Sequence, residues 1–153
     1  MTEIIPPSSP EKPSSYWESN PQLLEQVRET AQRAYYVDET MVERMSLIFG
    51  NYPRVRIEMA QRRGVFNEMS KRQIDTMISM YFTIPPKTSE EMARILRVSP
   101  ERVGNIVSGI SRKLSIVRNR NLKYLDDEMS ALRAQEGMDL IRGRQIRKAE
   151  LGE

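Results

Sequence analysis

The sequence of 153 residues contains no cysteine and no histidine. Without cysteine the chain can form no disulfide, no thiolate metal site and no cysteine nucleophile, a composition that fits a reducing compartment. Without histidine as well, the usual zinc sites and the histidine-based acid–base and triad chemistries cannot be assembled. We therefore expect a protein that is not an enzyme and that binds neither a metal nor a cofactor.

Long hydrophobic runs are missing too. The longest covers only a few residues, far short of the roughly 20 that a membrane-spanning helix needs. The first residues are rich in Pro and Ser rather than basic and apolar, so they do not resemble a secretion signal. We expect a cytoplasmic protein with no membrane partner and one compact core, because single cores usually span about 100–200 residues.

Proline and serine are concentrated at the N-terminus. Residues 1–21 hold five of the nine prolines and few apolar side chains, which predicts a disordered tail over residues 1–20. Tyr16 and Trp17 interrupt this tail just before the folded part. An indole in a polar tail usually makes a contact, so we expect Trp17 either to pack onto the body of the protein or to dock on a partner.

From Pro21 onward apolar residues recur at helical spacing, and no window alternates strictly as a strand would. The predicted fold class is all-α, a multi-helix bundle. In a capping box a Ser or Thr hydroxyl and a Glu or Gln three residues later satisfy the first backbone N–H groups of a helix. Such boxes predict helix starts at Thr40, Ser70 and Thr88, and Ser99 followed by Pro100 predicts one more.

These signals divide the chain after the tail into three regions. They are an N-terminal helical region at 21–66, a tri- or tetra-helical helix-turn-helix unit at 67–121, and a helical C-terminal extension at 122–153. Helices are expected over 22–36 and from Pro53 to about Arg62. In the extension, Gly137 is expected to end a helix and to leave a frayed last segment.

Two short capped helices meet across a tight turn within residues 88–114. The second helix has an apolar face that we expect to be buried, formed by Val103, Ile106, Val107, Ile110, Leu114 and Val117. Its opposite face is polar, small or basic and fits the major groove of double-stranded DNA, which is about 12 Å wide. The residues expected to face the groove are Arg102, Asn105, Ser108 and Arg112. The residues expected to hold backbone phosphates are Arg97, Lys113, Arg118 and Arg120.

Positive charge is concentrated around this second helix. Residues 97–124 contain seven Lys and Arg against one acidic residue, Glu101, an excess of +6 in a chain whose net charge is +3. A solvated basic helix that closes an ordinary bundle would have similar caps and amphipathicity. The spacing of the caps, the small Ala93 where the helices cross and the charge excess together favour DNA binding.

Three stretches resemble sigma factor region 4 and, less closely, the LuxR-type DNA-binding domain. They are Met69-Ser-Lys-Arg-Gln-Ile-Asp-Thr-Met77, Thr88-Ser-Glu-Glu-Met-Ala-Arg-Ile-Leu-Arg-Val-Ser-Pro-Glu-Arg-Val103 and Ile110-Ser-Arg-Lys-Leu114. The resemblance covers about residues 69–122. It implies that a preceding helix, a scaffold helix and a recognition helix pack together, with the recognition helix in the major groove. Sigma region 4 reads a promoter element and also docks on RNA polymerase, so the resemblance implies either partner.

The chain departs from this family pattern at several positions. Arg97 stands where many such domains have glycine, and Gly104 and Gly109 replace larger residues in the recognition helix. The loop that contains Pro85-Pro86 is longer than in LuxR-type domains, which favours the sigma comparison. No sigma region 2 pattern is present, so a complete sigma factor is not expected.

The resulting hypothesis is a DNA-binding regulator of transcription. The alternatives are a region-4-like adaptor that binds RNA polymerase or a sigma factor, and a phage-type protein of DNA packaging or assembly. Beyond the helix-turn-helix unit, four apolar residues repeat at the spacing of a two-stranded seam, namely Leu122, Leu125, Met129 and Leu132. They either pack on the protein's own body or form a homodimer.

Overall fold

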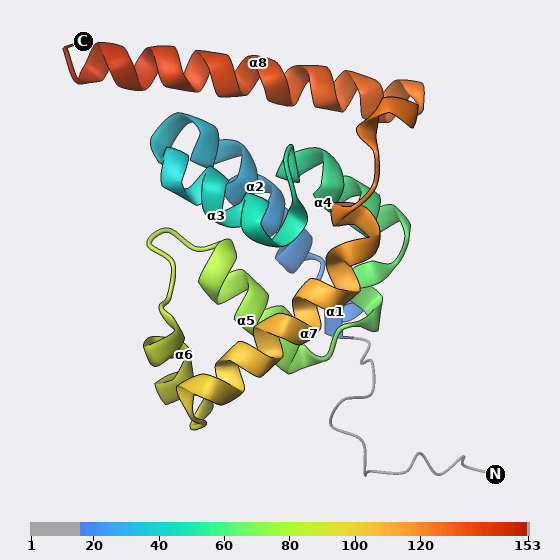
Figure 1. The fold of residues 1–153 in the computed structure, drawn as a ribbon, viewed down its shortest axis with the longest axis vertical. Coiled ribbons are helices and arrows are strands. Elements are labelled where there is room, and N and C mark those ends of the chain that lie inside the picture. The colour runs from blue at the N-terminus through green and yellow to red at the C-terminus, as the bar shows by residue number, and fades with distance from the viewer. Residues whose placement is uncertain (1–15, 153) are drawn as a thin grey trace.

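A computed structural model describes residues 16–152, which form eight α-helices and two short 3-10 helices (Figure 1). The α-helices are α1 Tyr16–Ser19, α2 Gln22–Val37, α3 Glu39–Phe49, α4 Pro53–Arg62, α5 Lys71–Tyr81, α6 Ser89–Leu96, α7 Pro100–Arg118 and α8 Asp127–Glu150. The 3-10 helices are η1 Val65–Glu68 and η2 Leu122–Tyr124. The predicted all-α class is confirmed, and no strand occurs between residues 16 and 152. In that range, no helix has the length and hydropathy needed to cross a membrane.

Two of the three predicted capping boxes form. The Ser70 hydroxyl accepts from Gln73 N at 3.2 Å while the Gln73 side chain accepts from Ser70 N at 3.1 Å, and Thr88 and Glu91 make the same reciprocal pair at the start of α6. The predicted start at Thr40 is wrong. Asp38 is the N-cap of α3 and its carboxylate accepts from the backbone N–H of Thr40 at 3.0 Å, because Asp is itself a strong N-cap and comes first in the chain.

The predicted tail ends earlier than residue 20. Its first 15 residues lie outside the described part of the chain, but Tyr16–Ser19 form α1 and the indole of Trp17 is only 5% exposed. That indole stacks on Phe66 with ring centroids 4.4 Å apart and donates to the Gln61 side chain at 2.9 Å. Trp17 therefore packs onto the body of the protein, which was one of the two expectations.

The main core draws on all three predicted regions. It contains Val27 and Phe49 from the first, Ile74 and Leu114 from the second, and Met129 from the third. A smaller cluster of Met80, Met92, Ala93 and Val103 lies beneath α6. One continuous core thus joins the helix-turn-helix unit to the rest of the described chain, while α6 packs on a core of its own.

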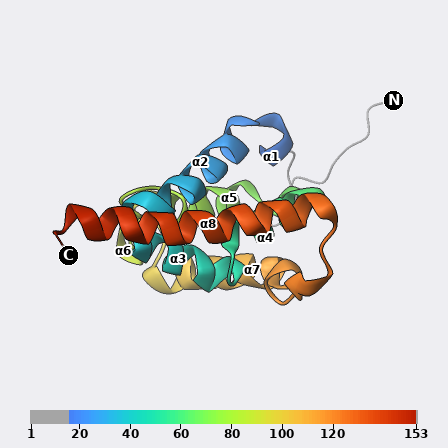
Figure 2. The ribbon, with the colours of Figure 1, turned by 90° about the horizontal axis from the view of Figure 1, so that it is seen from above.

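Helix α8 corrects the prediction for the C-terminal extension. It continues through Gly137 to Glu150 without a break and lies across α2, α3 and α4 (Figures 1 and 2). The four seam residues lie against the protein's own core, with Met129 buried and Leu122, Leu125 and Leu132 partly buried. Packing on the protein's own body is one of the two alternatives for these residues, and the homodimer stays a prediction.

Close packing explains why α8 has glycine at position 143. Gly143 is buried where α8 crosses α2, and a Cβ there would lie 1.8 Å from the carbonyl oxygen of Tyr35. Glycine in a helix interior costs about 1 kcal/mol relative to alanine. The close approach of the two backbones offsets this cost at Gly143, whereas a Cβ at Gly137 would meet only the Tyr52 ring, at 4.0 Å.

A buried carboxylate also fastens α8. Glu136 is fully buried, and its carboxylate accepts from the backbone N–H groups of Arg54 and Val55, each at 2.9 Å, and from the Tyr35 hydroxyl. It therefore caps the N-terminus of α4 from a different helix. Burial raises the pKa of the Glu136 carboxyl above its ordinary value, and the hydrogen bonds only partly oppose this effect.

We predict opposite effects for two Gly-to-Ala substitutions. Gly143→Ala should lower the free energy of unfolding by about 1–3 kcal/mol or more, because its Cβ meets a backbone atom that cannot move aside. Gly104→Ala in α7 should raise it by about 0.5–1 kcal/mol, because a Cβ there meets nothing within 4 Å. Urea unfolding of both variants measures the two changes, and equal effects would contradict the close contact of α2 and α8.

The raised pKa of Glu136 predicts a pH dependence of stability. Glu136→Gln keeps the size of the side chain and stays neutral. In the folded protein the pKa of the Glu136 carboxyl lies above its ordinary value of 4.5. The protonated carboxyl therefore contributes its full stability below about pH 4.5, and this contribution is lost as the pH rises through the pKa that Glu136 has in the folded protein. Urea unfolding at a series of pH values should show wild type losing stability relative to the variant, whereas a constant difference would refute the shift.

Candidate nucleic-acid interface

The turn between α6 and α7 is only three residues long, Arg97–Ser99. Arg97 adopts the left-handed conformation, with φ 58° and ψ 46°, and Val98 N donates to Ala93 O at 3.0 Å. This is the Schellman arrangement that usually has glycine at the left-handed position. Ser99 then caps α7 by accepting from Arg102 N at 3.2 Å. The expected tight turn is therefore present although arginine occupies the glycine position.

The inner face of α7 is buried as the periodicity predicts, except at two positions in its first half. Val103, Ile110, Leu114 and Val117 are all fully buried. Ile106 and Val107 were expected to be buried and are only partly so. This first half of α7 packs mainly on the short helices α5 and α6, which leave part of the apolar stripe uncovered.

The predicted groove-facing residues share the outer face of α7. Arg102, Asn105, Ser108 and Arg112 are all exposed. Arg97, in the turn, and Arg120, just beyond the C-terminal end of the helix, are exposed as well. These six side chains are free to meet a ligand, and their placement on one helix and its two ends follows from the predicted helical phase.

Two other predicted phosphate-binding residues have their donors directed into the protein. The Lys113 ammonium donates to Glu68 O and to the Gln73 side chain, both at 2.7 Å. The Arg118 guanidinium donates to Ile48 O at 3.2 Å and to Ser111 O at 2.9 Å. They fasten α7 to η1, α5 and α3, because long side chains can turn back toward nearby backbone carbonyls. The hydrogen-bond donors of both side chains are thus engaged within the protein.

A cleft of about 240 Å³ lies between the start of α5 and the outer face of α7. It is lined by three arginines and no carboxylate, the arginines being Arg72, Arg102 and Arg112. Arg72 was missed from the sequence, although its place in the first turn of α5 beside the Ser70 cap could have suggested it. Gly109 lies on the cleft wall, where a Cβ would come within 3.0 Å of Gln73 Nε2, so this glycine permits α5 and α7 to approach closely.

The C-terminal end of α7 is held by a residue that the sequence did not single out. Arg56 is 4% exposed and its guanidinium donates to Asn51 O at 2.6 Å, Val117 O at 2.6 Å and Arg120 O at 2.8 Å. Burial lowers the pKa of this guanidinium from its ordinary value. The arrangement satisfies carbonyls at the end of α7 that have no partner within the helix.

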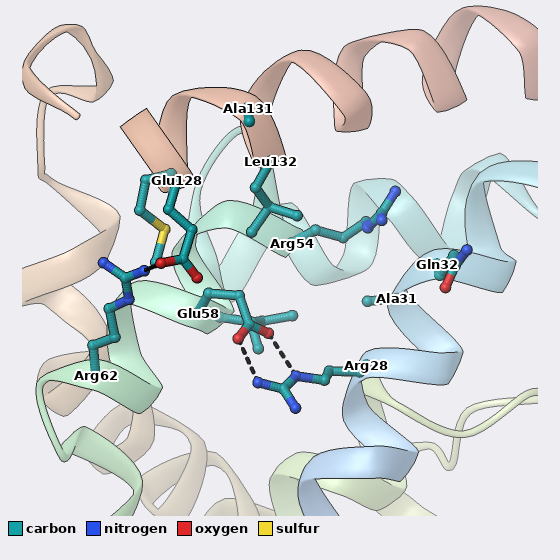
Figure 3. Close-up of a pocket in the computed structure, with 11 residues that line it drawn as sticks. Arg28, Ala31, Gln32, Arg54, Glu58, Arg62, Glu128, Ala131 and Leu132 are labelled. Carbon is teal, nitrogen blue, oxygen red and sulfur yellow. Dashed lines mark hydrogen bonds and ion pairs between the residues drawn. The ribbon is translucent and has the colours of Figure 1, made fainter. Parts of the chain in front are cut away.

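A larger groove of about 530 Å³ lies between α2, α4 and α8 (Figure 3). Its charges are compensated. Arg28 donates to both oxygens of Glu58, at 2.9 and 2.6 Å, and Arg62 pairs with Glu128 at 2.6 Å. Between residues 16 and 152 there is no cluster of three or more Asp or Glu side chains suited to a metal ion. The uncompensated cleft beside α7 is therefore the stronger candidate for an anionic partner.

Comparison with models of known protein families, with curated proteins and with solved structures finds no match to this chain. The resemblance to sigma region 4 thus remains a prediction.

The left-handed turn at Arg97 predicts an unusual gain from glycine. Arg97→Gly should raise the free energy of unfolding by about 1 kcal/mol, because glycine adopts φ 58° without the Cβ clash that costs other residues about 1–2 kcal/mol. Arg94→Gly, one turn earlier on the exposed face of α6, should lower it by about 1 kcal/mol. Thermal melting of the two variants, each of which loses one positive charge, checks the prediction. If both variants melt at a lower temperature than wild type, the turn relaxes around Arg97 and the prediction is wrong.

Proposed function

We propose that this chain is a DNA-binding regulator of transcription in which α7 enters the major groove of duplex DNA. The observation that carries the proposal is the outer face of α7, which is polar or basic, exposed and next to a cleft with three arginines and no carboxylate. A duplex brings closely spaced phosphates to such a surface. Asn105 and Arg112 are side chains able to read base edges, while Arg97 and Arg72 are placed at the two flanks to contact phosphates.

The fixed position of α7 supports the same function. Base reading requires a helix whose angle to the rest of the protein is set before DNA arrives. Helix α7 is anchored along its inner face by Ile110, Leu114 and Val117 and at its end by Arg56. DNA would therefore meet a surface that needs little reorganisation on binding.

A second candidate is an adaptor that binds RNA polymerase or a sigma factor through the same unit. Two observations favour it. The exposed position of Gly104 on α7 places no side chain where a base contact could form, and Ile95 on α6 is 58% exposed. An apolar side chain of this kind suits a protein surface better than a phosphate backbone.

Salt dependence separates phosphate contacts from base contacts. Replacing both Arg72 and Arg97 by Ala should flatten the slope of log K against log salt by roughly 2, since each phosphate contact contributes about −0.9. Replacing Asn105 by Ala should reduce discrimination between sequences and leave the slope nearly unchanged. Fluorescence anisotropy with a selected duplex and a scrambled duplex measures both effects.

The matched control replaces Arg142 and Lys148 by Ala. Both are exposed on α8, at the opposite side of the molecule from α6 (Figure 1), and their loss changes the net charge by the same amount. If the slope of log K against log salt flattens equally in this control, the effect comes from the overall charge of the protein and not from specific phosphate contacts. If wild type shows no salt-sensitive association with any duplex at low ionic strength, DNA binding is excluded and the adaptor function is favoured.

A further inference from the structure

A second basic pocket opens at the C-terminal end of α7, distinct from the cleft beside its first half. Its volume is about 570 Å³, and its walls come from the loop between α3 and α4, the segment after α7 and the first half of α8. The lining includes four cationic side chains and no carboxylate. These are Arg56, Arg120, Lys123 and Arg133. The pocket therefore has a local charge of +4 in a chain of net charge +3.

The second pocket differs from the groove of Figure 3 in that its positive charges are not paired with carboxylates. In that groove the guanidiniums of Arg28 and Arg62 are each matched by a carboxylate. In the second pocket, Arg120, Lys123 and Arg133 form no ion pair with any residue between 16 and 152. A positive pocket without a compensating acid attracts an anion more strongly than a paired surface does.

The floor of the pocket adds a buried charge. Arg56 is 4% exposed, and every hydrogen-bond partner of its guanidinium is neutral, comprising the backbone carbonyls of Asn51, Val117 and Arg120 and the side-chain oxygen of Asn51. The Glu136 carboxylate acts on this charge from a distance but forms no ion pair with it. A charge removed from water without a direct ion pair is costly and favours an anion that approaches from the open side. The carbonyls orient the guanidinium but do not neutralise it.

The walls hold a second guanidinium in a defined position. Arg133 lies over the ring of Tyr52, 4.8 Å from its centroid, which positions its planar face while its N–H edge remains available. Tyr52 itself has a left-handed backbone, with φ 54° and ψ 61°. Ser130 and Asn121 add neutral donors to the lining. Planar guanidiniums with nearby hydroxyl and amide donors match the oxygens of a phosphate group.

We propose that this pocket binds a phosphate group, with Arg120, Lys123 and Arg133 contacting its oxygens and Arg56 supplying charge from beneath. A multiply charged phosphate suits a local charge of +4 better than a carboxylate, which carries a single charge. The phosphate belongs either to a nucleic-acid backbone or to a small phosphorylated molecule. The proposal does not depend on base reading by the outer face of α7.

The experiment uses the full chain and one double variant of the pocket, Lys123→Gln with Arg133→Gln. Pyrophosphate is the small probe, measured by isothermal titration calorimetry, and a duplex of about two helical turns is the nucleic-acid probe, measured by anisotropy over a salt series. The matched control is Arg142→Gln with Lys148→Gln, which removes the same charge from exposed positions elsewhere on α8. Circular dichroism and melting verify that each variant folds. If losing the contact between Arg133 and the Tyr52 ring unfolds the double variant, Arg120→Gln is used in its place. The Arg120 side chain makes no hydrogen bond within residues 16–152.

We expect the pocket variant to bind pyrophosphate roughly tenfold more weakly than wild type, or worse, while the control changes little. The variant in Arg72 and Arg97 should keep its pyrophosphate binding, which separates this site from the proposed DNA contact. If wild type ignores pyrophosphate but the pocket variant flattens the salt slope for duplex by roughly 2 relative to the control, the bound phosphate is that of nucleic acid. Equal behaviour of the pocket variant and the control with both probes, or binding of neither probe by wild type, overturns the proposal.

Discussion

The position of α7 depends on the buried guanidinium of Arg56. From α4 it donates to the carbonyls of Val117 and Arg120, at and just beyond the end of α7, across 61 and 64 residues of sequence. Removing it would take away hydrogen bonds to a charged group, each worth about 1.5–3 kcal/mol. Gly50 makes room for this contact, because its φ of 97° and the 3.1 Å separation of a Cβ there from Arg56 Nε exclude a side chain. The N-terminal half of the chain thereby sets the angle at which α7 leaves the core.

Helix α7 bridges two cores of unequal size. Its second half is buried in the main core through Ile110, Leu114 and Val117, and its first half reaches the small cluster beneath α6 through Val103. Because α6 packs on so few apolar side chains, its orientation depends on the tight turn at Arg97 and on the capping of both helices. The second half of α7, which is buried in the main core, thus fixes the helix while its outer face stays exposed. The proposed reading of DNA by α7 requires both features.

Local signals in the sequence predict the helices around the candidate site. The features that these signals do not predict depend on contacts between residues far apart in the sequence. Periodicity and caps predicted α5, α6 and the phase of α7, because each depends on residues within one or two turns. Gly137 was expected to end α8, but tertiary packing along α2 and α4 overrides local helix propensity. The charges of Lys113 and Arg118 are visible in the sequence and predict phosphate contacts, whereas the carbonyls to which these side chains donate are brought near them only by the fold. Arg56 and Glu136 act across even longer separations, so no spacing could have indicated them.

The net charge of +3 is an average that conceals how the charge is arranged. Carboxylates accompany the cations on α2, α4 and the start of α8, and they are absent from the linings at both ends of α7. Along the chain, the lining of the cleft reaches Arg112 and that of the second pocket begins at Arg120, eight residues later or about 12 Å at 1.5 Å per residue. That distance is shorter than one turn of B-DNA, about 34 Å, so a single duplex is long enough to reach both linings. The sites at which this protein can attract an anionic partner are therefore determined by where carboxylates are absent, and not by the number of cations in the chain.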